Sequence, residues 1–365
     1  MIDYNAIDIN WIEKVSKANR NADKTLVEKT IRAFVLLEGL VSAGLPFVFK
    51  GGTSLMLLTK SSKRMSIDID IIMPDVPTHL TETLEAVAQK QGFLRVEPQE
   101  RHGETKVPKM HYKFYYKPIH RTANDEDFVL LDILMEQVPY ADIKQVEITS
   151  RFLPMGEPST MVMMPSANDL LGDKLTAFAP NTTGIPYLKN GNGMGMEINK
   201  QLYDVACLFD LFDDLKVVTS TFERIVDNEL HYREGDNLTK MDVLEDVFQT
   251  ALCVSTRGMQ GKGEFDELMA GIKRVNGFIF SESYQIDKAI VCASKAAYLS
   301  ALIKSGASEL ERFGDSSQIK DWQIEQTEYN KLNKLKKTSA EAFFYWYKAC
   351  LMLASSHSIV FLDGF

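Results

Sequence analysis

The chain has 365 residues, 45% of them hydrophobic, which predicts a globular protein long enough for two domains. No run of about 18 or more apolar residues occurs, so a membrane-spanning helix is excluded and no membrane partner is expected. Lys and Arg number 41 against 50 Asp and Glu, a formal net charge of −9, so any nucleic acid must bind through a local basic patch.

The N-terminal segment and the cysteines indicate where the protein works. The first residues, MIDYNAIDINWIEK, carry acids early and lack a basic-then-apolar signal, which argues against secretion. The four cysteines lie in apolar helical contexts without CxxC spacing, so we expect free, packed thiols rather than disulfides or a zinc site. Both observations favour a cytoplasmic location.

The first part of the chain, residues 1–155, alternates between helical and strand patterns. Apolar residues at helical spacing predict a helix over 24–43, which Gly44 and Pro46 end. Glycines at 51 and 52 then turn a short strand into a brief helix. The remaining predicted elements of this part are strand Ile67–Met73, helix 80–91, and strands Met110–Lys117 and Phe128–Met135. We therefore expect an α+β domain with a small mixed or antiparallel sheet flanked by helices.

The second part, residues 156–365, is predicted to be a mostly helical domain. A Gly/Asn-rich segment, 180–195, has no helical period and is expected to be a long mobile loop. The helices expected around it are 166–179, 199–214, 217–231, 239–256, 283–305 and 338–353.

Three aspartates on two predicted strands are candidate metal ligands. Asp68 and Asp70 are two residues apart, so they project from the same face of a strand. Neighbouring carboxylates repel unless a cation lies between them, and oxygen ligands suit Mg²⁺ or Mn²⁺. Asp132 shares its predicted face with apolar side chains, so a metal or a positive partner is implied, and it could instead be a general base. The simpler alternative is that all three lie on solvated strand faces or ends.

The glycine turn is a candidate phosphate site. Gly51 and Gly52 allow close approach of the backbone to a ligand, and the N-terminus of the following helix offers free N–H groups. The Thr53 and Ser54 hydroxyls could add hydrogen bonds. Lys50 precedes the glycines, so this is not a Walker loop. An ordinary strand–turn–helix with a Ser/Thr cap is the alternative.

Several cations have two explanations each. Arg64 could contact phosphates or pair with an acid, and Lys174 lies on an apolar helical stripe, where a lysine faces a cleft or covers apolar surface with its stem. Lys200 and Asp204 are four residues apart and could form an intrahelical ion pair. Strand 110–117 alternates a core face with a basic stripe that could contact RNA or polyphosphate; the stripe comprises Lys109, His111, Lys113, Lys117 and the nearby Arg121.

The ordered motifs KGGTSL, RMSIDIDI, LLDIL, DKLTAF and KQLYDVACLFD, over about residues 30–215, resemble the AbiEii/AbiGii-type nucleotidyltransferase toxins of type IV toxin–antitoxin, abortive-infection systems. This resemblance implies a polymerase-β-like nucleotidyltransferase core followed by a helical C-terminal domain. Two helices of that domain, the one with the DKLTAF motif and the one with the KQLYDVACLFD motif, would contribute to the active-site cleft. It also implies that Gly51, Gly52 and Thr53 or Ser54 cradle the triphosphate, that Lys174 contacts its phosphates, and that Asp204 supports or completes the site. Lys50, Arg64 and Lys200 are further candidate nucleotide-binding residues. Asp68 and Asp70 would bind Mg²⁺, with Asp132 as the third carboxylate.

The resemblance further implies partners and an activity. We expect transfer of NMP from an NTP to a hydroxyl, with tRNA as the acceptor, and a resulting arrest of growth or phage propagation. A cognate antitoxin is implied, acting at transcription or by direct contact. Two alternatives stay open: an antibiotic-type transferase with a small-molecule acceptor, which the acidic net charge favours, and a nucleotide-binding regulatory protein without turnover.

Overall fold

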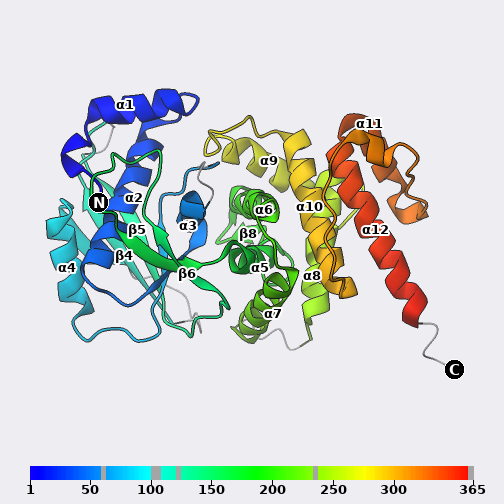
Figure 1. Cartoon of the computed structure of the whole chain (residues 1–365), viewed down its shortest axis with the longest axis horizontal. Coiled ribbons are helices and arrows are strands. Elements are labelled where there is room, and N and C mark those ends of the chain that lie inside the picture. Colours follow the sequence, from blue (N-terminus) through cyan, green and yellow to red (C-terminus); the bar gives the residue numbers. More distant parts are fainter. Residues whose placement is uncertain (59–62, 100–107, 121–124, 233–236, 361–365) are drawn as a thin grey trace. The chain divides into compact units, whose positions relative to one another are not determined.

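In the computed structural model the chain forms two compact units, shown in Figure 1. Residues 1–58, 63–99, 108–120, 125–232 and 237–360 are described, with side chains as far as residue 354. Unit 1 comprises Met1–Ser166 and Gly277–Ser283, and unit 2 comprises Ala167–Asn276 and Tyr284–Phe365. Within the described ranges, no helix is both long enough and apolar enough to cross a membrane.

Unit 1 is an α+β fold, as the sequence predicts. Its helices are α1 (Ile9–Ala18), α2 (Lys24–Ser42), α3 (Gly51–Leu58) and α4 (Leu80–Lys90). Its main-sheet strands are β1 (Val48–Lys50), β2 (Ile69–Ile72), β3 (Arg95–Pro98), β4 (Lys109–Tyr116) and β5 (Asp127–Leu134). A separate ribbon pairs β6 (Ile143–Glu147) with β7 (Met161–Pro165).

The main sheet is mixed, with strand order β1-β2-β5-β4-β3. The β2–β5 pair is parallel, whereas every other neighbouring pair is antiparallel. One face is fully buried, because the branched side chains that alternate along β2 and β5 all point to it: Ile69, Ile71, Val129, Leu131 and Ile133. Helix α2 covers this face, where Arg32 lies over the Tyr116 ring. The opposite face of the sheet carries the candidate aspartates.

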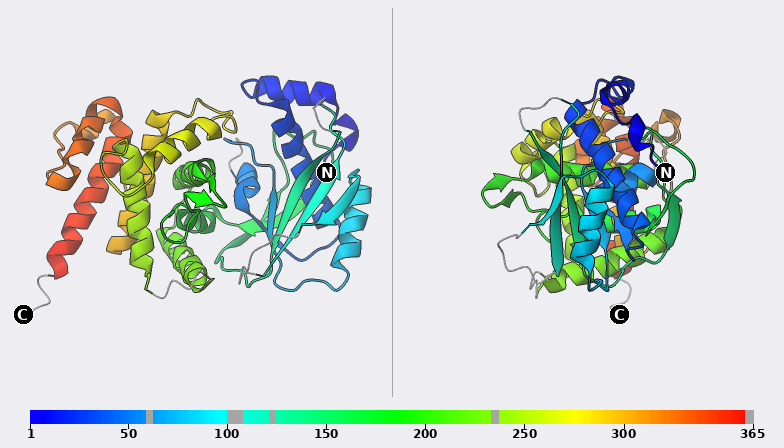
Figure 2. Two further views of the ribbon diagram at one scale, coloured as in Figure 1. Left: turned by 180° about the vertical axis from the view of Figure 1, so that it is seen from behind. Right: turned by 90° about the vertical axis from the view of Figure 1, so that its left-hand side faces the viewer.

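Unit 2 is helical. Its helices are α5 (Ala167–Ala177), α6 (Gly195–Phe209), α7 (Leu215–Tyr232), α8 (Lys240–Ser255), α9 (Phe265–Val275), α10 (Ile286–Ser305), α11 (Leu335–Thr338) and α12 (Ala340–Val360). A short hairpin joins β8 (Leu188–Lys189) to β9 (Asn192–Gly193). Helix α10 is central: it packs on α6, α8 and α12, and its many alanines let these neighbours approach closely. Figure 2 shows the same helices from behind.

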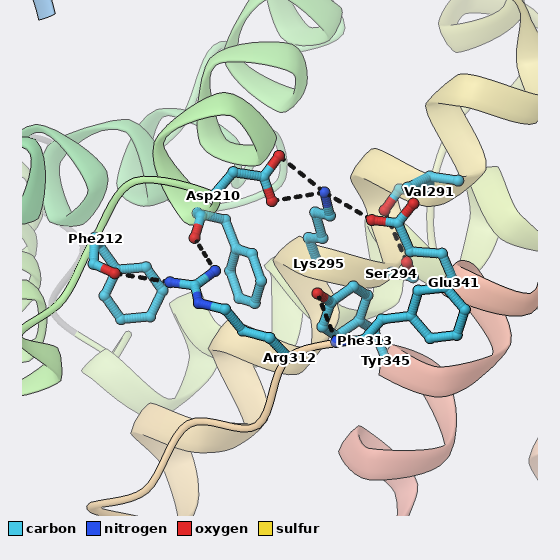
Figure 3. Close-up of polar contacts among 10 residues, drawn as sticks. Asp210, Phe212, Val291, Ser294, Lys295, Arg312, Phe313, Glu341 and Tyr345 are labelled. Carbon is cyan, nitrogen blue, oxygen red and sulfur yellow. Dashed lines mark hydrogen bonds and ion pairs between the residues drawn. The ribbon is translucent and has the colours of Figure 1, made fainter. Parts of the chain in front are cut away.

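Two cationic side chains link the helices of unit 2, the buried Lys295 and the exposed Arg312 (Figure 3). Lys295 of α10 lies 2.7 Å from Asp210, just after α6, and 2.9 Å from Glu341 of α12. Arg312 donates to the carbonyl oxygens of Phe209 and Phe212, each at 2.7 Å, which satisfies the otherwise unpaired carbonyls at the end of α6.

Two regions differ from the predictions. The unit boundary lies at Ser166, beyond the predicted position at residues 155–156, because β7 pairs with β6 and so belongs to unit 1. The segment 180–195, predicted to be one long mobile loop, is a turn followed by the β8–β9 hairpin and the start of α6. Buried Asp246 fixes the turn by accepting hydrogen bonds from the Asn181 backbone and side chain and from the Thr182 hydroxyl.

Candidate nucleotide and metal site

The glycine corner at the start of α3 lies directly against Asp70. Gly51 has a φ of +79°, in the left-handed region that favours glycine. A Cβ atom placed on Gly51 would lie 2.7 Å from Asp70 Cγ and 2.8 Å from Asp70 Cβ. No side chain fits between the two residues, so the backbone of the corner and the carboxylate of β2 are immediate neighbours. The predicted convergence of glycine turn and acidic strand is therefore present in unit 1.

Gly52 lies against a cation. A Cβ atom on Gly52 would be 2.7 Å from Arg64 Nη2 and 2.8 Å from the Ser66 hydroxyl oxygen. The Arg64 residue is only 8% exposed, and its Nη1 donates to the Met65 carbonyl oxygen at 3.2 Å. Its guanidinium thus lies beside the N-terminus of α3, where helix N–H groups and a positive charge together suit an anion.

The hydroxyls of Thr53 and Ser54 donate hydrogen bonds to backbone carbonyl oxygens within unit 1. Both residues are fully buried. Thr53 Oγ1 donates to the Asp68 carbonyl oxygen at 2.5 Å, and Ser54 Oγ donates to the Gly51 carbonyl oxygen at 2.8 Å. A hydroxyl has one proton to donate, so these two side chains shape the corner, and the corner's donors toward a ligand are backbone N–H groups.

Four side chains form a row across the face of the sheet opposite α2. Register places Lys50 opposite Asp70, Asp70 opposite Asp132, and Asp132 opposite His111. Paired residues on neighbouring strands point to the same face, about 4.8 Å apart. The row therefore reads cation, carboxylate, carboxylate, imidazole, and it is contributed by β1, β2, β5 and β4. Lys50 Nζ also lies 5.7 Å from the centre of the buried Tyr140 ring.

The carboxylates have the exposure that a ligand site needs. Asp68 and Asp70 are partly exposed, and the Asp132 side chain is 28% exposed. Asp68 lies one residue before β2 begins, because the regular strand is shorter than the predicted Ile67–Met73. Its backbone is fixed to the corner through Thr53. Asp68 and Asp70 therefore both border the glycine turn.

The oxygen donors at this corner fit a hard divalent cation. Mg²⁺ usually binds one or two protein carboxylates and completes its octahedron with substrate phosphates and water. Asp68 and Asp70 supply such a pair, and the backbone of Gly51 lies directly against Asp70. In the described part of the chain, no group of three or more His, Cys, Asp or Glu residues forms a ready-made metal cluster. Asp132 as a third ligand remains a prediction.

The remaining predicted residues lie in unit 2. Lys174 of α5 is 3.4 Å from Asp204 of α6 and donates to Gln201 at 3.0 Å. The Lys174 and Asp204 side chains are 11% and 2% exposed, so this is a nearly buried ion pair. Lys200 Nζ lies 3.2 Å from Glu197, one turn away on α6. Lys174 and Asp204, predicted on separate helices, are thus brought together by the packing of α5 on α6.

The basic stripe on β4 is only partly positive. As predicted, Tyr112, Phe114 and Tyr116 are buried on the core face. On the other face His111 contacts Asp132, and Lys113 Nζ lies 4.6 Å from the Phe128 ring centre and opposite Glu97 in register. Lys109 and Lys117 are exposed, and Arg121 lies outside the described residues.

Sequence reasoning did not predict the part that three residues take in these clusters. Ser66 could have been found from its spacing, because it lies two residues before Asp68 in the RMSIDIDI motif. His111 was included in the basic stripe, but its position opposite Asp132 depends on strand register, which no local signal shows. Gln201 joins Lys174 through helix packing alone.

Unit 1 is an α+β domain in which a glycine corner lies against a strand aspartate of a mixed sheet, the arrangement expected of a nucleotidyltransferase core. Residues 35–270 match the family described as "Nucleotidyl transferase AbiEii toxin, Type IV TA system". This match spans more than half of the chain, so the protein belongs to the AbiEii family of nucleotidyltransferase toxins. The recognition made from the motifs is confirmed. No curated relative matches in sequence.

Solved structures give only distant likenesses. The crystal structure of JHP933 from Helicobacter pylori is 14% identical, with a TM-score of 0.39, over 76% of this chain and 92% of that one. A candidate nucleotidyltransferase from H. pylori is 15% identical, with a TM-score of 0.40, over 79% of this chain and 97% of that one. Likenesses at this level carry no argument, so the assignment rests on the family match.

Proposed function

We propose that the protein transfers a nucleoside monophosphate from an NTP to a hydroxyl group, with Mg²⁺ or Mn²⁺ as the metal. The observation that carries this proposal is the contact of Gly51 with Asp70, beside Asp132 in register. This arrangement joins a backbone that a phosphate can approach to carboxylates that a cation can bind. A regulatory nucleotide-binding protein would not need paired acids at the phosphate corner.

Under this proposal, each candidate site residue of unit 1 has a defined task. The N–H groups at the start of α3 and the Arg64 guanidinium would donate to phosphate oxygens. Asp68 and Asp70 would hold the divalent cation, which when bound neutralises phosphate charge and aligns the reacting groups. Asp132 would either bind the cation or accept the proton of the attacking hydroxyl. Catalysis of this kind is mostly positioning and charge neutralisation.

We also propose tasks for the site residues of unit 2. Lys174 would contact the nucleotide phosphates, Asp204 would hold that lysine by the ion pair of 3.4 Å, and Lys200 would add positive charge. A lysine with only 11% of its side chain exposed has few other conformations, so its ammonium is preorganised.

For the acceptor, we propose the hydroxyl of an RNA end, with tRNA as the specific case. Exposed Lys109, at the start of β4, and exposed Lys117, just after its end, supply local positive charge. Modified tRNA would stop translation, which accounts for a toxin, and the family implies a cognate antitoxin. A cytoplasmic location supplies both NTP and tRNA.

The test is transfer of label from each of the four α-³²P NTPs to total RNA, in the presence of Mg²⁺. The wild-type protein is compared with Asp70→Asn and with Asp75→Asn, an exposed aspartate just after β2 that serves as the control. We expect transfer by the wild type and by Asp75→Asn, and a loss of at least a hundredfold in Asp70→Asn. Growth arrest on expression should follow the same order. Equal transfer by both variants would contradict the site.

A second acceptor class has support from the charges near the stripe. Arg95 is paired with Glu97 and Glu126, both at 2.7 Å, and Lys29 is paired with Asp127 at 2.8 Å. These pairs leave little net positive charge for a polyanion on a protein of net charge −9. A small hydroxyl- or amine-bearing acceptor is therefore the second candidate, and label that moves to small compounds but never to RNA would establish it.

A further inference from the structure

A histidine on β4 contacts the aspartate of β5. His111 Nδ1 lies 2.7 Å from Asp132 Oδ1, and the two residues are register partners on antiparallel strands. The His111 side chain is 10% exposed, so strand packing limits the orientations of its ring. An ionised carboxylate can only accept hydrogen bonds, so the proton of this contact is on Nδ1 and the His111 nitrogen donates.

Asp132 has a carboxylate neighbour on its other side. Asp70 is its register partner on the parallel strand β2, at the usual separation of about 4.8 Å between strands. Like charges at this range repel, and repulsion would turn a carboxylate without a fixed partner away from the row. The bond to His111 holds one oxygen of Asp132 on the β4 side. The direction of the other oxygen is then fixed as well, because the carboxylate is planar.

The contact is not required for burial. With 28% of its side chain exposed, Asp132 can be solvated by water, so a hydrogen bond from a neighbouring side chain is not needed to avoid an unsatisfied buried charge. If the contact only balanced the charge of Asp132, a lysine at position 111 would serve as well, and the same strand face already carries lysines at 109 and 113. An imidazole differs from lysine because it donates from a rigid ring at a fixed position.

We propose that His111 is a positioning residue: it orients the Asp132 carboxylate for its part in nucleotidyl transfer. This inference rests on the proposed function, because Asp132 needs a fixed direction only if it binds the cation or takes a proton. Partners that orient a functional carboxylate or imidazole in this way typically contribute 10- to 100-fold to activity or metal affinity.

The experiment compares His111→Leu with His111→Asn in the full chain. Asn places an N–H donor close to the position of Nδ1, whereas Leu fills the volume without a donor. We expect His111→Leu to lower kcat about 10- to 100-fold with the KM for NTP within about threefold, and His111→Asn to recover most of the loss. A kcat unchanged in His111→Leu, while Asp70→Asn abolishes transfer, would overturn the role of His111 and leave the proposed function standing.

A second readout does not use activity. Nitrogen-15 NMR of the histidine rings should show His111 protonated on Nδ1 in the wild type and shifted toward the Nε2-protonated form in Asp132→Leu. An unchanged tautomer in Asp132→Leu, with the variant folded, would overturn the contact itself. If the wild type transfers no label to any acceptor, the proposed function fails, and the role of His111 in transfer fails with it even where the NMR result holds.

Discussion

Replacing Gly51 with alanine tests the closest contact of the site. Gly51 has a φ of +79°, and the new methyl group would lie 2.8 Å from Asp70 Cβ and 2.7 Å from Asp70 Cγ. Carbon atoms in normal contact are about 3.5 Å apart or more, so the overlap is roughly 0.7 Å. Rotation of the Asp70 side chain moves Cγ but not Cβ, so the α3 corner and β2 must separate.

Gly44 provides a matched control within the same unit. Its φ is +73°, and a Cβ atom there would meet nothing within 4 Å. Gly44→Ala therefore carries only the backbone cost of a left-handed alanine, about 1–2 kcal/mol. Gly51→Ala carries the same cost plus overpacking of about 1–3 kcal/mol. We expect the free energy of unfolding of unit 1 to fall by about 1–2 kcal/mol in the control and about 2–5 kcal/mol in Gly51→Ala.

The functional difference should exceed the difference in stability. A displacement approaching 1 Å at a site that works by positioning can lower the rate about a hundredfold. We expect Gly51→Ala to lose label transfer by at least that factor at a temperature where denaturation curves show it folded, and Gly44→Ala to keep it within about threefold. NTP affinity by calorimetry should follow the same order. If folded Gly51→Ala binds NTP and transfers label like Gly44→Ala, the corner does not hold the substrate.

Three further predictions concern the other cations. Lys174→Met leaves the Asp204 carboxylate, whose side chain is 2% exposed, without its lysine, so the free energy of unfolding of unit 2 in urea should fall by about 3–5 kcal/mol. The double variant Lys174→Met/Asp204→Leu should recover most of this stability and still transfer no label. Recovered label transfer in the double variant would contradict the catalytic role of Lys174. Burial lowers the pKa of Lys295, but the nearby carboxylates of unit 2 outweigh it and raise that pKa above its ordinary value. Lys295→Met should therefore lower the free energy of unfolding by about 1–3 kcal/mol below about pH 10.4, against about 0.5 kcal/mol or less for the control Lys304→Met on the same helix. This loss of stability should shrink as pH rises through the folded-state pKa of Lys295. A loss that does not change with pH would refute this account. Arg64→Lys keeps the charge but loses the guanidinium fork, so NTP affinity should fall about tenfold while nucleoside affinity stays unchanged; equal weakening of both would exclude a phosphate contact.

Much of the secondary structure was predictable because its signals are local. The helical period of residues 24–43, the glycines that follow, and the alternation in MHYKFYYK correspond to α2, the α3 corner and β4. The helices α1 and α9 and the short strands β3, β6 and β7 were not among the predicted elements. The strands among these are five residues or fewer, and such short segments carry little periodic signal.

The sequence alone determined the α+β class, the glycine turn beside an acidic strand, and the family, because turn chemistry, side-chain periodicity and motif order are written within short stretches. The tertiary structure alone decided which side chains meet. Asp70, Asp132 and His111 lie on three strands, and their alignment depends on register, since a shift of one residue would turn Asp132 to the buried face. Lys174 reached Asp204 only through the packing of α5 on α6. Contacts between distant segments follow from the burial of the whole core, which no short stretch of sequence contains.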